Sequence, residues 1–227
     1  MYTCIAHIFV YKNKIIFTNK NKISKEMAKL KGLEFQMEEL KGLVFPGPGD
    51  NLVKCVALCF TKPDGTPLFN TIKQMFNDAD ISITHRHDIE PWRDKERFKK
   101  IISMHYRDIG EVHIRCGEDV YEKTEKYVMG ENGDKIIYFI LEWWAPEGRV
   151  QESYDKIRNF VVGYRNPDKA HPKSIRWKLG EKGQDPKNML KNLIHMSDSW
   201  ETAYKEIMNF YSSHPRELKR ILKGFTI

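Results

Sequence analysis

The stretch Asn188–Tyr211 reads NMLKNLIHMSDSWETAYKEIMNFY, and its pattern predicts a short strand, a polar turn and a helix. Apolar residues precede the turn and form the expected strand: Leu190, Leu193 and Ile194. The turn holds residue types that accept hydrogen bonds from the free N–H groups at a helix start: Ser197, Asp198 and Ser199. Beyond it, apolar residues recur at helical spacing: Ala203, Ile207, Phe210 and Tyr211.

This unit places His195 at the predicted end of the strand, beside the N-terminus of the helix. A helix N-terminus favours anions, phosphate included. Asp198, with Glu201 three residues further on, fits a variant of the capping box. Glu206 lies about two turns into the helix, from where its carboxylate could hold one imidazole nitrogen and leave the other as a nucleophile. The unit therefore suits phosphate chemistry, although a lone histidine at a strand end is also a common structural residue.

The same residues resemble the active-site signature of the nucleoside diphosphate kinases, N-x-x-H-G-S-D-S-x-x-x-A-x-x-E-I. The positions that agree are Asn192, His195, Ser197, Asp198, Ser199, Ala203, Glu206 and Ile207. Met196 stands where the family has glycine. Two more stretches agree in the right order: Lys62–Gly65 resembles the family's K-P-D-G, and Gly163–Arg176 resembles its G-x-T-N-P-x-x-x-x-P-G-T-I-R loop. The resemblance covers roughly residues 54 to 211.

The resemblance implies that His195 accepts a phosphoryl group from a nucleoside triphosphate and then passes it to a nucleoside diphosphate. A histidine that carries the group splits a difficult transfer into two easier steps. Glu206 is then expected to orient His195, and Ser197 to support Glu206. Without the resemblance, Glu206 would be interpreted as a solvent-facing residue of an amphipathic helix, and Ser197 as a helix cap only.

Further residues are expected around the nucleotide. The resemblance implies that Lys62 contacts phosphate and a ribose hydroxyl as a mobile point charge, and that Arg176 offers its planar fork to phosphate. Asn192 is expected at the sugar, and Tyr106 beside the transferred phosphate. Arg165 stands in place of the threonine that lies two positions after the glycine of the family's loop, so it too is expected at the nucleotide. Each of these residue types also has an ordinary surface or core role.

Two family residues have no clear counterpart here. A family arginine on the helix before the loop falls by direct spacing on Asn159, and the neighbouring Arg158 is the alternative. The aromatic residue that stacks on the base falls on Ile114. Mg²⁺ is expected to bridge the nucleotide phosphates, without an acidic metal site of the protein's own. A catalytically weak nucleotide-binding or regulatory protein on the same fold therefore remains the alternative function.

The composition of the chain bears on other classes of function and on the location of the protein. The formal net charge of +7 fits a polyphosphate ligand or nucleic acid, but lysines are spread along the chain and no nucleic-acid-binding motif is present. No apolar run reaches the roughly 18 residues of a membrane span. The four cysteines lack metal-ligand spacing, which indicates reduced thiols and a cytoplasmic protein. The resemblance also implies a homo-oligomer.

The order of expected elements predicts an α+β fold. Strands are expected at 52–60, 81–84, 135–143 and before His195, with helices at 68–76, 92–106, 119–128 and 150–161. Without the extra helices this is βαββαβ, the ferredoxin-like arrangement, which the pattern allows and the resemblance favours. The Pro/Gly-rich segment 45–50 predicts a boundary between a 1–50 extension, with a hairpin and a helix at 24–40, and a 51–227 domain.

Overall fold

The computed structural model describes residues 9–11, 14–16, 51–107, 120–129, 135–184 and 190–223. Contacts divide the chain into two units, Met1–Leu43 and Val44–Ile227. In the first unit β1 (Phe9–Tyr11) pairs antiparallel with β2 (Lys14–Ile16), in agreement with the predicted hairpin. The helix expected at 24–40 and the Pro/Gly-rich segment 45–50 lie outside the described residues, so the boundary at residue 50 stays a prediction.

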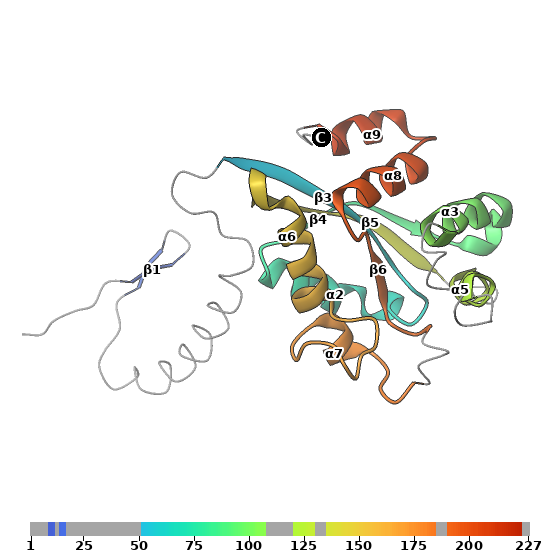
Figure 1. Ribbon diagram of the computed structural model, residues 1–227, viewed down its shortest axis with the longest axis horizontal. Coiled ribbons are helices and arrows are strands. Elements are labelled where there is room, and N and C mark those ends of the chain that lie inside the picture. Colours follow the sequence, from blue (N-terminus) through green and yellow to red (C-terminus); the bar gives the residue numbers. More distant parts are fainter. Residues whose placement is uncertain are drawn as a thin grey trace, which may run out of the picture. The chain divides into compact units, whose positions relative to one another are not determined.

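The second unit is built on one four-stranded antiparallel sheet in the order β4-β5-β3-β6 (Figure 1). Its strands are β3 (Leu52–Thr61), β4 (Ser82–Ile89), β5 (Ile136–Pro146) and β6 (Ile194–Met196). The first strand of this sheet in chain order thus lies between the third and the fourth, which is the ferredoxin-like order, and the predicted fold class is confirmed. The two central strands are almost continuously buried, which explains their unbroken apolar sequences.

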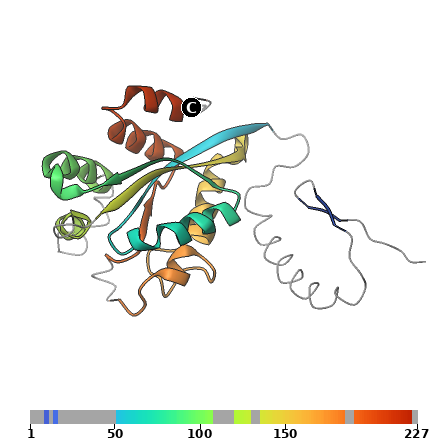
Figure 2. The same ribbon diagram turned by 180° about the vertical axis from the view of Figure 1, so that it is seen from behind.

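Helices cover both faces of the sheet. They are α2 (Phe69–Asp78), α3 (Lys95–Arg107), α5 (Val120–Met129), α6 (Val150–Lys156), α7 (Ile175–Leu179), α8 (Trp200–Phe210) and α9 (Pro215–Ile221). Figures 1 and 2 show α2 and α6 on one side of the sheet and α3 and α8 on the other. None of the described helices has the length and apolar character that crossing a membrane requires.

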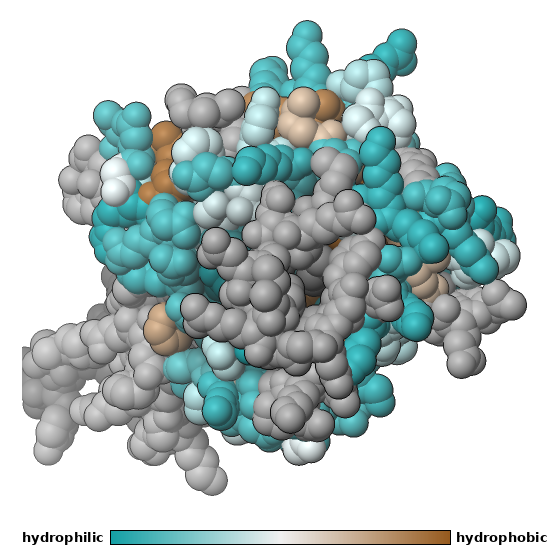
Figure 3. Space-filling view, turned by 45° about the vertical axis from the view of Figure 1, so that its right-hand side comes forward, coloured by the Kyte–Doolittle hydropathy of each residue, from teal (hydrophilic) through white to brown (hydrophobic). Residues whose placement is uncertain are grey.

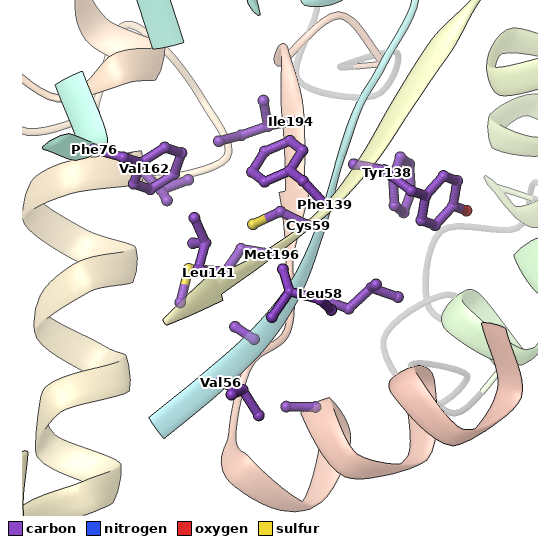
Figure 4. Packing of buried hydrophobic residues seen from close by; sticks show 14 of the residues in the cluster. Val56, Leu58, Cys59, Phe76, Tyr138, Phe139, Leu141, Val162, Ile194 and Met196 are labelled. Atoms are coloured by element: carbon purple, nitrogen blue, oxygen red, sulfur yellow. The ribbon is translucent and has the colours of Figure 1, made fainter. Parts of the chain in front are cut away.

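The core alternates between these two layers along β5. Phe139 makes edge contacts with Phe69 and Phe76 of α2, whereas Tyr138 stacks on Phe210 of α8. Figure 4 shows Phe139 among the buried residues on the side of the sheet that α2 covers. The residues coloured in Figure 3 are mostly hydrophilic, in agreement with the high content of charged residues. The two apolar layers hold the sheet rigidly between the helices.

The helix before the predicted loop does not end as a regular α-helix. A π-helix, η5 (Ile157–Val162), follows α6 and ends at Gly163. The N–H of Gly163 donates to the carbonyl of Arg158, five residues back, at 2.8 Å. Gly163 has a φ of 94°, and a Cβ there would lie 2.3 Å from Ser174 Oγ, so only glycine fits this position.

Several local predictions need correction. Ile175 and Arg176 belong to α7 and not to a loop, because the Ser174 side chain accepts a hydrogen bond from Trp177 N and starts a helix there. The cap of α8 is Ser199, which accepts from Thr202 N, and not the Asp198 expected for the capping box.

Two further differences concern the C-terminal part. His195 is the central residue of the three-residue strand β6 and does not stand at its end. Helix α9 was not predicted, although Pro215 in its first turn is a typical start signal.

Candidate active site

The predicted histidine lies in a hydrogen-bonded chain of three side chains. His195 Nε2 is 3.0 Å from Glu206 Oε1, and the Ser197 hydroxyl donates to Glu206 Oε2 at 2.6 Å. The side chain of His195 is 12% exposed and that of Glu206 only 4%. A buried carboxylate must be paired, and these two contacts pair both of its oxygens. Because a carboxylate only accepts, Nε2 carries the proton in this contact.

Backbone bonds hold this chain in place at the sheet. Ser197 N donates to Leu58 O at 3.0 Å, and Leu58 N donates to Ser197 Oγ, also at 3.0 Å. Ser197 is therefore joined to the central strand β3 through both its main chain and its side chain. Glu206 comes from the second turn of α8, so the sheet and the helix fix the two ends of the chain independently.

The K-P-D-G stretch contacts the segment before His195. Lys62 N donates to Leu193 O at 2.7 Å, and Leu193 N donates to Asp64 Oδ2 at 3.0 Å. Leu193 has a φ of 70°, an unusual conformation for leucine, which these two bonds stabilise. Gly65 packs so closely that a Cβ there would lie 2.1 Å from Leu193 O. The stretch thus acts as a clamp on the backbone that leads into β6.

Lys62 is buried at the end of β3, with 5% of its surface exposed. Its ammonium donates to Leu190 O at 3.0 Å. Burial, assisted by the positive charge of Arg176 and opposed by the carboxylate of Asp64, lowers the pKa of Lys62 to about 7. The side chain is therefore poised to gain charge when an anion comes near.

Arg176 is directed at the protein backbone in this structure. Its guanidinium donates from Nε to Asn192 O at 3.0 Å, from Nη1 to Gly163 O at 2.9 Å, and from Nη2 to Ile194 O at 2.6 Å. The planar fork therefore joins the segment that starts at Gly163 to the segment that leads into His195. The resemblance implies that the guanidinium binds phosphate, whereas in this structure it donates to three backbone carbonyls.

Of the remaining predicted residues, the structure describes the side chains of Asn192 and Arg165 but not those of Tyr106 and Ile114. Asn192 is buried, and its Nδ2 donates weakly to Arg165 O at 3.5 Å. Asn192 Oδ1 has no hydrogen-bond partner within the described part of the chain. The side chain of Arg165 is exposed. Tyr106 belongs to α3, but its side chain lies outside what the structure describes, as does Ile114.

The sequence assigns no role to two residues near the site, Asp64 and Phe60, and offers a third, Arg158, only as an alternative. Asp64 belongs to the K-P-D-G stretch, and it accepts from Leu193 N and from Tyr127 Oη, the latter at 2.7 Å. Phe60 stacks on the His195 ring, with centroids 4.8 Å apart. Arg158 forms an ion pair with Asp198 at 3.0 Å. An alternating strand pattern could have suggested Phe60, because it lies two residues before Lys62 on β3.

The fold of this sheet and its helices is similar to that of nucleoside diphosphate kinases. A nucleoside diphosphate kinase from Borrelia burgdorferi, described as a transition state mimic with bound vanadate and ADP, superposes with a TM-score of 0.53. The two are 20% identical, and the match covers 70% of this chain and 87% of that chain. Nucleoside diphosphate kinases from Encephalitozoon cuniculi and Aquifex aeolicus, each 20% identical, give TM-scores of 0.49 and cover 87% and 94% of those chains.

A curated relative carries the same name. The nucleoside diphosphate kinase of Bacillus cereus (strain ATCC 10987 / NRS 248) is 35% identical over 100 residues, which is 42% of this chain. The match spans 59% of that relative, less than two thirds of its length. No family model matches the chain. The resemblance to the nucleoside diphosphate kinase family that the motifs indicated is confirmed by this relative and by the fold.

Proposed function

We propose that this protein transfers the terminal phosphate of a nucleoside triphosphate to a nucleoside diphosphate through a phosphohistidine on His195. The observation that carries the proposal is the buried chain from Ser197 through Glu206 to His195 Nε2. Such a chain gives the imidazole one tautomer and one orientation, which a nucleophilic histidine needs. The resemblance to nucleoside diphosphate kinases supplies the reaction class.

In the proposed reaction, the lone pair of His195 Nδ1 attacks the terminal phosphorus. The bond from that phosphorus to its bridging oxygen breaks, and the nucleoside diphosphate leaves with the electron pair. Glu206 stabilises the positive charge that the ring gains, through the Nε2–H bond. A second nucleoside diphosphate then attacks the phosphohistidine in the reverse sense. Both half-reactions use one site, so the kinetics are ping-pong.

The neighbouring cations and the unpaired amide oxygen provide the nucleotide contacts. The ammonium of Lys62 exchanges its bond to Leu190 O for phosphate oxygens when the nucleotide binds. Arg176 fixes the backbone around the site and adds positive potential near the phosphates. The buried Asn192 Oδ1 accepts a hydrogen bond from a sugar hydroxyl, which satisfies an otherwise costly buried acceptor. Arg165 and Tyr106 complete the proposed set.

Mg²⁺ is proposed as the companion of the nucleotide. Within residues 51–107, 120–129, 135–184 and 190–223, no group of three or more His, Cys, Asp or Glu side chains could hold a metal ion. Mg²⁺ usually binds through the phosphate oxygens of a nucleotide and needs few protein ligands. When bound, the ion neutralises charge on the phosphates. We further propose a cytoplasmic homo-oligomer, as the resemblance implies.

A second function is favoured by one observation. Lys62 and Arg176 both donate to backbone carbonyls in this structure, at 2.6–3.0 Å. If they keep these bonds when a nucleotide is present, the protein would bind the nucleotide weakly and would transfer phosphate slowly. It would then act as a nucleotide-binding or regulatory protein on the same fold.

The test is transfer of label from ATP carrying ³²P in its terminal phosphate. The wild type should hold an acid-labile, base-stable label and release it as GTP when GDP is added. A His195→Ala variant should take up none. A His214→Ala variant, which removes a histidine that contacts His87 and Tyr211, should be labelled like the wild type. Absence of label on the wild type, with measurable nucleotide binding, would leave the second function.

A further inference from the structure

Four rings lie in one row across the sheet, one from each strand. The register pairs them directly, in the order His87, Tyr138, Phe60 and His195. Directly paired residues of antiparallel strands point to the same face, so the four rings share the face that α8 covers. The candidate nucleophile is therefore the last ring of a row that begins at the opposite edge of the sheet.

The rings near His195 are closely stacked. Phe60 lies against His195 with an interplanar angle of 20° and against Tyr138 with an angle of 26°, both at centroid distances of 4.8 Å. Tyr138 stacks in turn on Phe210 of α8 at 4.3 Å and 11°. Phe60 and Tyr138 are fully buried. Phe60 is therefore held on both faces and cannot turn without displacing its neighbours.

We propose that Phe60 is a positioning residue for His195 and sets the plane of its imidazole ring. The proposal rests on the phosphohistidine function proposed above. The contact with Glu206 fixes the position of Nε2 more than it fixes the plane of the ring. The flat face of Phe60 fixes that plane, because tilting the imidazole would drive its edge into the phenyl ring. Nδ1 then keeps one direction of attack.

Ordinary core packing makes a different prediction, and the chain offers a matched control. Phe139 is also fully buried, but it follows Tyr138 on β5 and packs against α2 on the other face of the sheet. Phe60→Leu and Phe139→Leu remove the same atoms from equally buried sites. If Phe60 only fills space, the two variants should lose stability and activity alike. If it sets the plane of His195, only Phe60→Leu should slow the chemical step.

The kinetic test compares the two variants in single-turnover labelling with ATP. Phe60→Leu should lower the rate of phosphohistidine formation at saturating ATP about tenfold, because misplacing a reacting atom by a fraction of an ångström slows attack. The ATP concentration for half-maximal rate should change less than twofold. Phe139→Leu should keep the wild-type rate per folded molecule. Equal rates in the two variants would overturn the proposal. Phe60→Met, which fills irregular space flexibly, replaces Phe60→Leu if the latter does not fold.

A second readout does not depend on activity. In protein with ¹⁵N-labelled histidine at alkaline pH, the two ring nitrogens of wild-type His195 should give well-separated signals of one tautomer. In Phe60→Leu the separation should shrink, because the ring leaves Glu206 part of the time, while Phe139→Leu should match the wild type. Unchanged signals in Phe60→Leu would overturn the positioning role. If no wild-type label forms, the proposed function fails, yet these signals still decide the role of Phe60.

Discussion

Replacing Gly65 by alanine should damage the candidate active site through a single added methyl group. The backbone of Gly65 has a φ of −89° and a ψ of −22°, which alanine adopts without strain. The effect of the substitution is therefore purely steric. A Cβ at this position would lie 2.1 Å from Leu193 O and 2.8 Å from Leu193 C. Both are backbone atoms, so no side-chain rotation can relieve the clash.

The size of the effect follows from that distance. Real Cβ atoms essentially never come closer than 3.0 Å to another atom, so the Leu193 peptide must move by at least 0.9 Å. The carbonyl of Leu193 accepts from Lys62 N and its N–H donates to Asp64 Oδ2, and the residue leads into β6 two residues before His195. Overpacking of this kind costs about 1–3 kcal/mol of unfolding free energy. A displacement near 1 Å at a reacting group costs about 100-fold in rate.

The assay combines urea unfolding with labelling by ATP carrying ³²P in its terminal phosphate. Gly148→Ala is the matched control, because its two chain neighbours apart, no described residue has an atom within 4 Å of the Cβ that it adds. This control should stay within about 0.5 kcal/mol of the wild type and keep its labelling rate. The reasoning would be refuted if Gly65→Ala unfolded at the same urea concentration as Gly148→Ala and was labelled equally fast.

Four further predictions concern three side chains. Ser197→Ala removes hydrogen bonds to a buried carboxylate and a buried backbone N–H, so it should lower the free energy of unfolding by about 1–3 kcal/mol, measured by urea unfolding. The affinity for ADP, measured by calorimetry, should fall up to about tenfold between pH 7 and 8, because neutral Lys62 must take up a proton to bind phosphate. The affinity of the Lys62→Arg variant should not depend on pH in this way. The free energy of unfolding of the wild type should also rise with pH between about 7 and 10.5 relative to Lys62→Met, since the unfolded chain binds the extra proton over that range. Asp198→Asn breaks an exposed ion pair with Arg158 and should shift thermal stability by no more than about 1 kcal/mol, in contrast to Ser197→Ala.

The sequence predicts the order of the elements and the identity of the central histidine. Both depend on local patterns, namely buried apolar runs, helical spacing and a motif that spans a strand, a turn and a helix. The contacts from Ser197 to Glu206 and from Glu206 to His195 were expected from the resemblance, because only Glu206 lies in the helix, whereas His195 lies in β6 and Ser197 follows that strand. Their roles in transfer rest on the resemblance and are proposals.

Contacts between distant segments could not be predicted in the same way. The stacking of Phe60 on His195 requires the register of two strands that are more than 130 residues apart. The three bonds of Arg176 depend on the path of the backbone around Asn192, which no spacing encodes. The positive φ of Leu193 could not be predicted either, because the bonds that stabilise it come from Asp64 and Lys62, which are distant in the sequence.

The π-helix before Gly163 changes how this chain should be aligned with its relatives. A π turn encloses one residue more than an α turn, so a π-helix such as η5 can hold one extra residue without lengthening the loop that follows. Counting back from Gly163 without a gap puts Asn159 opposite the arginine of the family. An alignment that opens a one-residue gap inside the helix puts Arg158 there instead, the residue whose guanidinium meets Asp198. One inserted residue of this kind would make an arginine shared with the family look like a substitution in a gapless comparison.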